Sequence, residues 1–275
     1  MIKLIVTDMD GCLLDSKSNF PSNFKEAYDL MKANNVIFAV ASGRSIDGLY
    51  RAFGEQAGEM TFVSDNGARI CHKGELLAEE ILTYEDYAPF LEEMRSHKDL
   101  LSIACGEERK WVENEKAVSE RARAELLKFY PGWYESSFEN VPEKVIRFAM
   151  LYFDDIEKNI YPYFKKYDNE RVRVQVTSYE WIDIYPKNVS KGRGVKAIQE
   201  RFGILPSETM VFGDYLNDIS MAYHAEHSYA PANAHPDVIE RFTDKIRSND
   251  ECGVTDTIIN ILKNSETSSR LKYLE

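Results

Sequence analysis

The sequence predicts an α/β fold in which a doubly wound, Rossmann-like parallel sheet is interrupted by an inserted α+β domain. Over residues 1–81, short apolar runs rich in β-branched residues alternate with amphipathic helical stretches, and this alternation resumes over 188–275. Between them, over 82–187, aromatic residues are dense and the strands alternate in polarity, as in an antiparallel sheet. We therefore expect a discontinuous core domain, 1–81 with 188–275, and an inserted domain, 82–187.

The N-terminal part of the core begins with residues 2–7, an apolar run that suits a strand buried on both faces. A second buried strand is expected over 36–41, and a short helix then leads to a third strand over 61–64. Between the first two strands, four apolar residues fall on one helical stripe: Phe24, Ala27, Tyr28 and Met31. This strand–helix–strand rhythm predicts parallel strands with helices on both faces of the sheet.

The insert contains its own set of helices and strands. We expect an antiparallel sheet with one face covered by helices and the other face free. The helices are predicted over 84–97, 116–129 and 155–167, and the strands over 100–113 (two short strands around Gly106), 145–153, 171–177 and 181–185.

The core pattern returns after Pro186. The expected elements are a helix over 192–202, a strand over 209–212, a helix over 218–225, a short strand over 228–230 and a helix over 254–263. The tail from Asn264 is polar and serine-rich, and we expect it to be frayed.

The composition narrows the class of protein. A net charge of −12 argues against non-specific nucleic-acid binding, because phosphate backbones attract basic faces. The four cysteines contain no Cys-x-x-Cys pair, so free thiols are expected rather than a zinc site or a disulfide framework. No stretch is long and apolar enough to span a bilayer, and the N-terminus lacks a signal-peptide pattern. We therefore expect a soluble, cytoplasmic protein.

Polar clusters follow four of the expected core strands. Singly, each has an ordinary explanation as a solvated turn, a loop, a hairpin turn or a helix cap. Together they fall at the carboxyl ends of strands, where open parallel sheets form their sites. The clusters are Asp8-Met9-Asp10-Gly11, Ser42-Gly43-Arg44, Asp65-Asn66-Gly67, and Gly213-Asp214 with Asn217-Asp218.

Phosphoryl transfer is the chemistry that fits these residues. The carboxylate of Asp8 can act as a nucleophile and form an aspartyl-phosphate. Mg²⁺ prefers oxygen ligands, which Asp8 and Asp214 can supply. Asp10 is close enough to protonate the leaving oxygen and then to activate water. Ser42 can donate a hydrogen bond to a phosphate oxygen. Lys191 opens a helix, a position suited to anions, although alone it would be taken for an exposed surface lysine.

The motifs resemble those of a known superfamily. DMDGCL (8–13), SGR (42–44), SKG (190–192) and GDYLND (213–218) occur in the order of the four motifs of the haloacid dehalogenase-like superfamily. DNGA (65–68), the NDxxM pattern ending at Met221, NAH (233–235) and the position of the insert resemble the Cof-type subfamily of subclass IIB, which consists of sugar-phosphate phosphatases. The insert itself resembles a C2-type cap, which closes over the site and selects the substrate.

This resemblance implies roles for individual residues. Asp8 is the nucleophile and Asp10 the general acid and base. Magnesium is bound by Asp8, the backbone carbonyl of Asp10 and Asp214, with Asn217 and Asp218 in supporting positions. Ser42 and Lys191 hold the phosphoryl group, with Gly43 also among the phosphate-binding residues, and Arg44 and Asn66 lie where they can contact the phosphate or the leaving group.

Two positions depart from the family pattern. Cys12 stands where the family usually has Thr, so a weak thiol donor replaces a hydroxyl, and we expect a modest loss at most. Near residue 230 the family tends to have Met-Gly before the Asn, whereas this chain has Pro231, which removes a backbone donor and fixes φ. Because of Pro231, the sequence does not predict the geometry of the loop around Asn233.

Residues of the insert are harder to assign. Four residues just before the return to the core could reach a sugar-like substrate: Tyr179, Glu180, Trp181 and Asp183. Alternatively, they form an aromatic strand that packs on helices of the insert. His224, His227 and His235 show no metal-ligand spacing, and we interpret them as structural or surface residues.

The sequence thus predicts a Mg²⁺-dependent phosphatase of small phosphorylated metabolites, with sugar phosphates as the leading class by resemblance. Two alternatives stay open. A phosphomutase would use the same aspartyl-phosphate, and a non-catalytic phosphosugar-binding regulator would use the same fold. The presence of Asp8, Asp10, Lys191 and Asp214 argues against the regulator, because a binding protein needs no nucleophile.

Overall fold

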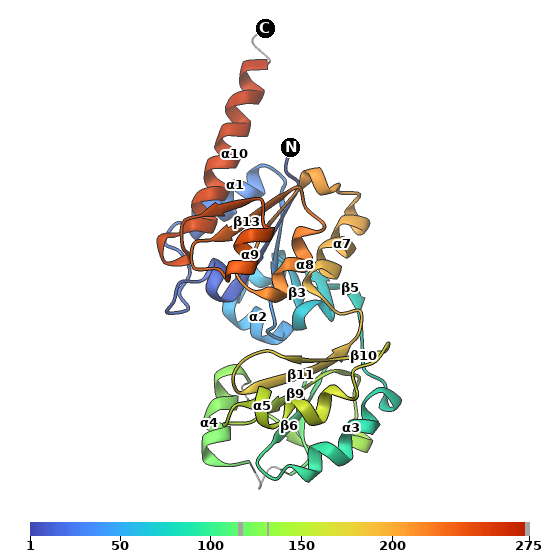
Figure 1. Cartoon of the computed structure of the whole chain (residues 1–275). Coiled ribbons are helices and arrows are strands. Elements are labelled where there is room, and N and C mark those ends of the chain that lie inside the picture. The colour runs from blue at the N-terminus through green and yellow to red at the C-terminus, as the bar shows by residue number, and fades with distance from the viewer. Residues whose placement is uncertain (115–117, 131, 273–275) are drawn as a thin grey trace. The chain divides into compact units, whose positions relative to one another are not determined.

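The computed structural model describes residues 1–114, 118–130 and 132–272 (Figure 1). Its internal contacts divide the chain into two compact units. The core unit comprises Met1–Ala78 with Ser190–Glu275, and the insert unit comprises Glu79–Val189.

The core unit is built on one eight-stranded sheet with β1 among its central strands. Its order is β14-β13-β12-β1-β2-β3-β4-β5, and the pairs from β14 to β3 are parallel, which confirms the predicted doubly wound parallel sheet. The strands are β1 (Leu4–Asp8), β2 (Ile37–Ala41), β3 (Thr61–Ser64), β4 (Arg69–His72), β5 (Glu75–Glu79), β12 (Thr209–Phe212), β13 (His227–Pro231) and β14 (Asp244–Ile246).

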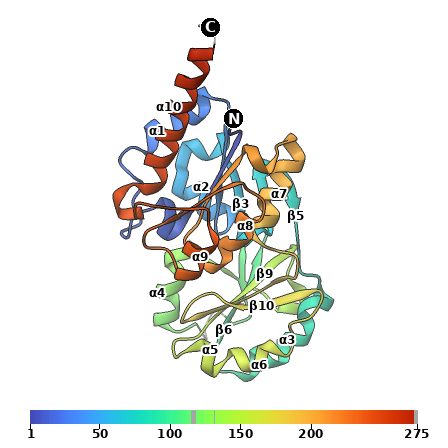
Figure 2. The same ribbon diagram turned by 45° about the horizontal axis from the view of Figure 1, so that its top comes forward.

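Helices cover both faces of this sheet because successive residues of each strand point to opposite sides. In β1, Ile5 packs into the cluster formed with α1, α2 and α10, whereas Leu4 and Val6 pack with α7, α8 and α9. Figures 1 and 2 both show α1 and α10 side by side. The helices are α1 (Phe24–Ala33), α2 (Ile46–Phe53), α7 (Lys191–Phe202), α8 (Ile219–Ala222), α9 (Pro236–Arg241) and α10 (Gly253–Lys272).

Parts of the core unit differ from expectation. Strands β4, β5 and β14 and helix α9 were not predicted, and β4 pairs antiparallel with β3 through the turn at Asp65–Gly67. The Asp-Asn-Gly sequence therefore forms a hairpin turn, which was its ordinary interpretation. The tail expected to be frayed from Asn264 instead continues α10 to Lys272, since the segment contains neither Gly nor Pro to end the helix.

The insert unit contains a six-stranded sheet of order β10-β11-β9-β6-β7-β8. Its pairs are antiparallel except β7 with β8. The strands are β6 (Leu101–Gly106), β7 (Lys110–Val112), β8 (Tyr134–Glu135), β9 (Val145–Leu151), β10 (Val172–Val176) and β11 (Trp181–Pro186), and the helices are α3 (Tyr84–Ser96), α4 (Glu120–Phe129), α5 (Ile156–Asn159) and α6 (Tyr161–Lys165).

Two expectations about the insert were wrong. The single helix predicted over 155–167 is divided into α5 and α6, because Pro162 begins a new helix in its first turn. The free face of the sheet is also covered. On one face, helices α3, α5 and α6 share a cluster with Ala104 and Phe148. On the other face, α4 packs Ala122 and Leu126 against Ile103 and Ala149, which neighbour Ala104 and Phe148 in the strands and so point the opposite way. The predicted start of α4 near residue 116 lies outside the described residues.

The remaining helical elements are short. A π-type turn spans Met9–Leu13, and 3₁₀ turns span Gly54–Glu59, Asp65–Gly67, Phe138–Asn140, Pro206–Glu208, Leu216–Asp218 and Asn249–Glu251. Among the described residues, no helix combines the length and the apolar character that crossing a membrane requires.

Candidate active site

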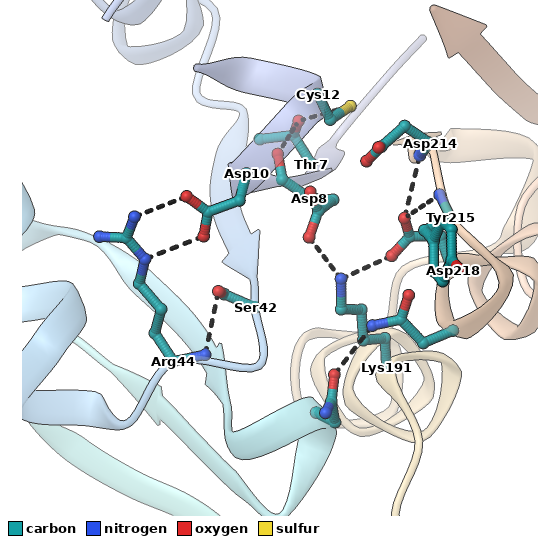
Figure 3. A network of polar contacts seen from close by, with 12 residues as sticks. Thr7, Asp8, Asp10, Cys12, Ser42, Arg44, Lys191, Asp214, Tyr215 and Asp218 are labelled. Carbon is teal, nitrogen blue, oxygen red and sulfur yellow. Dashed lines mark hydrogen bonds and ion pairs between the residues drawn. The ribbon is translucent and has the colours of Figure 1, made fainter. Parts of the chain in front are cut away.

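The four polar clusters converge at one edge of the core sheet. Figure 3 shows Asp8, Ser42 and Asp214 close together there, and Asn66 joins them through its bond with Asn217. Asp8 ends β1, Ser42 follows β2, Asp65 follows β3, and Asp214 comes shortly after β12. These four strands are consecutive in the sheet, in the order β12-β1-β2-β3, and they are parallel. Their carboxyl ends therefore meet, which is why side chains distant in the sequence lie close together here.

Lys191 lies at the centre of the site and is only 1% exposed, so it is not a surface lysine. Its ammonium donates to Oδ1 of Asp8 and to Oδ1 of Asp218, the latter at 2.6 Å. Burial acts to lower the pKa of Lys191, but the carboxylates of Asp218 and Asp8 outweigh it and hold that pKa above its usual value. Lys191 is therefore a buried, charged cation shared by two carboxylates.

Asp218 is oriented from its other side by the backbone. Its Oδ2 accepts from the N–H groups of Asp214, at 2.9 Å, and Tyr215, at 3.0 Å. Gly213 is needed at this turn, because a Cβ there would lie 2.4 Å from the Cβ of Asp218. The carboxylate of Asp218 thus links Lys191 to the main chain that carries Asp214.

The carboxylates of Asp8, Asp214 and Asp218 each offer an oxygen within 4.8 Å of the others. Oδ2 of Asp8 and Oδ1 of Asp214 are buried, and neither has a hydrogen-bond partner among the described residues. Burial raises the pKa of Asp8, with Lys191 opposing the rise. Burial and then the charge of Asp218 raise the pKa of Asp214 to about 6. Three ionised carboxylates with one ammonium carry an excess of two negative charges. Their oxygens are therefore suited to bind a divalent cation that prefers oxygen ligands.

The turn after Asp8 brings Asp10 and Arg44 together. Nε of Arg44 donates to Oδ2 of Asp10 at 2.8 Å, and Nη2 donates to Oδ1 at 2.5 Å. The Asp10 side chain is 48% exposed and that of Arg44 is 33% exposed. Such a bidentate pair fixes the orientation of both groups. Arg44, which was predicted to contact the phosphate or the leaving group, is thus paired with Asp10, the predicted general acid and base.

Ser42, Gly43, Asn66 and Asn217 form a second connected group in the site. Oγ of Ser42 accepts from the Arg44 N–H at 3.1 Å, and the carbonyl of Ser42 accepts from the Asn66 N–H at 2.9 Å. The Asn217 amide donates to Oδ1 of Asn66 at 3.0 Å. A Cβ on Gly43 would lie 3.4 Å from the Asn66 side chain. The side-chain amide of Asn217 is therefore engaged by Asn66.

Cys12 is buried, and its Sγ lies 3.7 Å from Oγ1 of Thr7. Thr7 in turn donates to the backbone carbonyl of Asp8 at 2.8 Å. Burial, followed by the charge of Asp8, raises the pKa of the Cys12 thiol. The thiol is therefore neutral and packed beneath the turn, in the apolar cluster that also contains Met9 and Leu13.

Two asparagines near the site received no role from the sequence. The Asn233 amide donates to the carbonyl of Gly11 at 2.8 Å, and the N–H of Asn249 donates to Oδ1 of Asn233 at 3.1 Å. The NAH motif was the signal for Asn233, and nothing local marked Asn249. Pro231 ends β13 and pairs in register with Ile246, so the loop forms with Pro231 in place.

In the insert unit, Asp183 is buried and bound from two sides. Arg147 donates to its Oδ1 at 2.5 Å, and the Tyr185 hydroxyl donates to its Oδ2 at 3.1 Å. Glu180 pairs with Arg121 at 3.2 Å, whereas Tyr179 is largely exposed. Among the described residues, the candidate metal cluster consists of the three carboxylates named above.

Known proteins are similar to this chain over nearly its whole length. The 5-amino-6-(5-phospho-D-ribitylamino)uracil phosphatase YbjI of Escherichia coli K12 is 30% identical over 263 residues, covering 95% of this chain and 97% of that protein. The crystal structure of SMU.1108c from Streptococcus mutans has a TM-score of 0.85 and 30% identity, covering 96% of this chain and 100% of the other. The subclass IIB sugar phosphatase BT4131 is similar in fold, with a TM-score of 0.76, 24% identity and coverage of 94% and 98%.

A family model described as haloacid dehalogenase-like hydrolase matches residues 5–258. The match includes the strand ends that carry Asp8, Ser42 and Asp214 as well as the whole insert. The chain therefore belongs to the haloacid dehalogenase-like hydrolases.

Proposed function

We propose that this chain is a Mg²⁺-dependent phosphatase that hydrolyses small phosphorylated metabolites through an aspartyl-phosphate on Asp8. The observation that carries the proposal is the state of Asp8. One oxygen of its carboxylate is held by Lys191, and the other is buried without a hydrogen-bond partner among the described residues. A carboxylate held at one oxygen and unengaged at the other is oriented to attack.

The donor set supports a magnesium site. Asp214 offers a buried oxygen without a partner among the described residues, and we assign the Asp8 carboxylate and the backbone carbonyl of Asp10 as the further ligands by family resemblance. Asp218 already binds Lys191 and two N–H groups, so we assign it, with Asn217, a supporting role rather than direct coordination. When bound, Mg²⁺ neutralises charge so that a phosphate dianion can approach a carboxylate.

The chain's own residues then divide the reaction into two steps. In the first, Oδ2 of Asp8 forms a bond to phosphorus while the bond from phosphorus to the leaving oxygen breaks, and protonated Asp10 gives its proton to that oxygen. In the second, Asp10 takes a proton from the water that attacks phosphorus, and the bond between phosphorus and Asp8 breaks. Inorganic phosphate leaves, and Asp8 and Asp10 return to their starting states.

The remaining site residues hold the phosphoryl group. We assign this role to Ser42, Gly43 and Lys191, with Asn66 joined to Ser42 through its backbone N–H. Arg44 has a different starting position, because it pairs with Asp10. For Asp10 to act as an acid, this pair must loosen, and the freed guanidinium can then bind phosphate or leaving group.

For the substrate, we propose a sugar phosphate or a related phosphorylated polyol. YbjI, the relative named above, is a phosphatase of a phosphorylated ribitylamino compound, and BT4131 is named as a sugar phosphatase. We assign the core unit to catalysis and the insert unit to substrate selection, as a cap.

A substrate panel tests the proposal. The purified chain with Mg²⁺ is incubated with hexose, pentose and alditol phosphates, and free phosphate and organic products are both measured. We expect free phosphate in an amount equal to the dephosphorylated product. Isomerised sugar phosphate without free phosphate would instead identify a mutase. Binding of these compounds without any turnover would identify a non-catalytic binding protein.

A further inference from the structure

One loop of the core unit contacts both segments that carry the unpartnered carboxylates. The side-chain amide of Asn233 donates to the carbonyl of Gly11, three residues after Asp8, at 2.8 Å. In the same loop, the backbone N–H of His235 donates to the carbonyl of Asp214 at 2.8 Å. The loop at 233–235 therefore binds the Asp8 segment with a side chain and the Asp214 segment with its main chain.

Asn249 is hydrogen-bonded to this loop. It is 7% exposed, and its backbone N–H donates to Oδ1 of Asn233 at 3.1 Å. Its own side-chain amide donates to the carbonyl of Leu14 at 2.9 Å. The turn after the nucleophile is thus held at two carbonyls, those of Gly11 and Leu14, by two asparagines that bind each other.

The carbonyl of Gly11 is an effective place to hold this turn. Gly11 has φ +84°, and a Cβ at this position would lie 2.6 Å from Oδ2 of Asp214. The turn therefore runs directly against the Asp214 carboxylate. Because a peptide unit is planar, fixing the Gly11 oxygen also fixes the N–H of Cys12 and so restricts ψ of Gly11, the residue that follows Asp10.

We propose that Asn233 is a positioning residue that sets the separation between the Asp8 and Asp214 segments, and thereby the affinity for Mg²⁺, with Asn249 orienting it. This inference rests on the proposed Mg²⁺-dependent phosphatase function. Asn233 does not touch the reacting atoms in this account. It acts through the two chain segments whose carboxylates bind the ion, in the way that hydrogen-bonding partners of metal ligands generally tune affinity.

The test replaces Asn233 by leucine, which keeps the approximate volume and removes both hydrogen bonds. Mg²⁺ binding to the substrate-free protein is measured by titration calorimetry, and kcat and KM are measured at saturating Mg²⁺. We expect the Kd for Mg²⁺ to rise about tenfold or more. At saturating Mg²⁺, kcat and KM should change much less, because excess ion restores the occupied site.

The chain offers a matched control in Asn23. Its side chain also bridges two segments of the core unit, donating to Asp256 at 2.6 Å and accepting from Thr255 at 2.6 Å. Asn23→Leu should lower the melting temperature and leave the Kd for Mg²⁺ within about twofold, because no metal ligand depends on Asn23. If Asn23→Leu weakened Mg²⁺ binding as much as Asn233→Leu, the effect would be general loosening and the inference would be wrong.

Asn249→Ala keeps the backbone N–H that orients Asn233 and removes only the bond to Leu14. It should weaken Mg²⁺ binding in the same direction by a smaller factor, because it loosens the Leu14 end of the same turn. If Asn233→Leu does not fold, Asn233→Ala, which also removes the amide that donates to Gly11, carries the test. An unchanged Kd in the folded variants, with an active and Mg²⁺-dependent wild type, would overturn the inference but not the proposed function. A wild type that binds no Mg²⁺ would overturn the proposed function itself.

Discussion

Lys191 is the buried cation on which the acidic site depends. It is the first residue of α7, where Ser190 caps the helix by accepting from the Arg193 N–H at 3.1 Å. The cap fixes where the helix begins and so where the lysine side chain starts. From there the ammonium neutralises part of the charge of Asp8 and Asp218, both of which are buried.

Lys191→Met should therefore damage both stability and activity. Removing the cation leaves two buried carboxylates without their partner, and we expect the free energy of unfolding to fall by about 3–5 kcal/mol. Urea denaturation of the metal-free protein at pH 7.5 measures this. Lys196→Met on the same helix is the control. Lys196 is exposed and weakly paired with Glu200, so a loss within about 0.5 kcal/mol is expected. Equal losses in the two variants would contradict this account of Lys191.

Asp214 gives the metal-free protein a distinct pH dependence. Its pKa is about 6 in the folded protein, against about 4 for an unperturbed aspartate. From pH 4 to 6 the folded state keeps a proton that the unfolded state releases, so the contribution of Asp214 to stability falls as pH rises. Above pH 6 the full cost of the buried charge is present.

Replacing Asp214 by asparagine removes that cost. Without metal, Asp214→Asn should melt at least about 3 °C higher than wild type at pH 7.5, and the difference should shrink towards pH 4. Calorimetric melting curves at several pH values measure it. A wild type that is the more stable of the two at pH 7.5 would show that Asp214 is not a penalised buried carboxylate.

At the residue scale, the sequence predicted which side chains would gather but not which would pair. Asp8, Ser42 and Asp214 could be located because each follows a strand of a parallel sheet, and topology alone brings strand ends together. The pairs of Lys191 with Asp218 and of Arg44 with Asp10 depend on rotamers and local backbone, which no spacing rule contains. Asn249 is distant in sequence from Leu14, and only tertiary structure brings the two together.

At the scale of elements, the turn at Asp65–Gly67 controls the start of α7. Gly67 has φ +103°, and a Cβ there would lie 2.0 Å from the carbonyl oxygen of Ser190. The guanidinium of Arg193 donates to the Gly67 carbonyl at 2.9 Å. The β3–β4 hairpin and the first turn of α7 are therefore in direct backbone contact, one residue before Lys191.

Gly67→Ala should displace this start. The strain of a positive φ and the clash with Ser190 together should cost roughly 3 kcal/mol of stability, with a loss of activity because Lys191 moves. Gly203→Ala, at the other end of α7, is the control. It also has positive φ, at +64°, but nothing lies near its Cβ position, so only about 1 kcal/mol should be lost and activity kept. Urea denaturation and phosphatase assays of both variants decide, and a fully active Gly67→Ala would contradict the coupling.

The elements that the sequence predicted correctly are those with a strong local pattern. The buried stripe of α1 contains the four residues expected, and β3 and β12 have the expected bounds. The errors arose where a local pattern was weak or was overruled. Pro162 divides a continuous amphipathic stretch, and the short edge strand β14 has little apolar content. The covering of the second face of the insert sheet by α4 depends on tertiary packing that periodicity does not specify.

At the scale of the whole molecule, the charge supports the proposed metal site. The chain has a net charge of −12, which opposes the approach of an anionic phosphate. The ammonium of Lys191 is already shared by Asp8 and Asp218. The guanidinium of Arg44 is paired with Asp10. The predicted fold class and hydrolase family are confirmed by the parallel sheet and by the family match over 5–258.

The central claim is that Asp8 is the nucleophile of a Mg²⁺-dependent phosphatase. Phosphate release from a generic aryl phosphate, with and without Mg²⁺, compared between wild type and Asp8→Asn, tests it most directly. The wild type should release phosphate only with Mg²⁺, and Asp8→Asn should lose at least about 10³-fold in kcat while remaining folded, since an amide cannot form the aspartyl-phosphate. Equal activity of a folded Asp8→Asn protein would contradict the account.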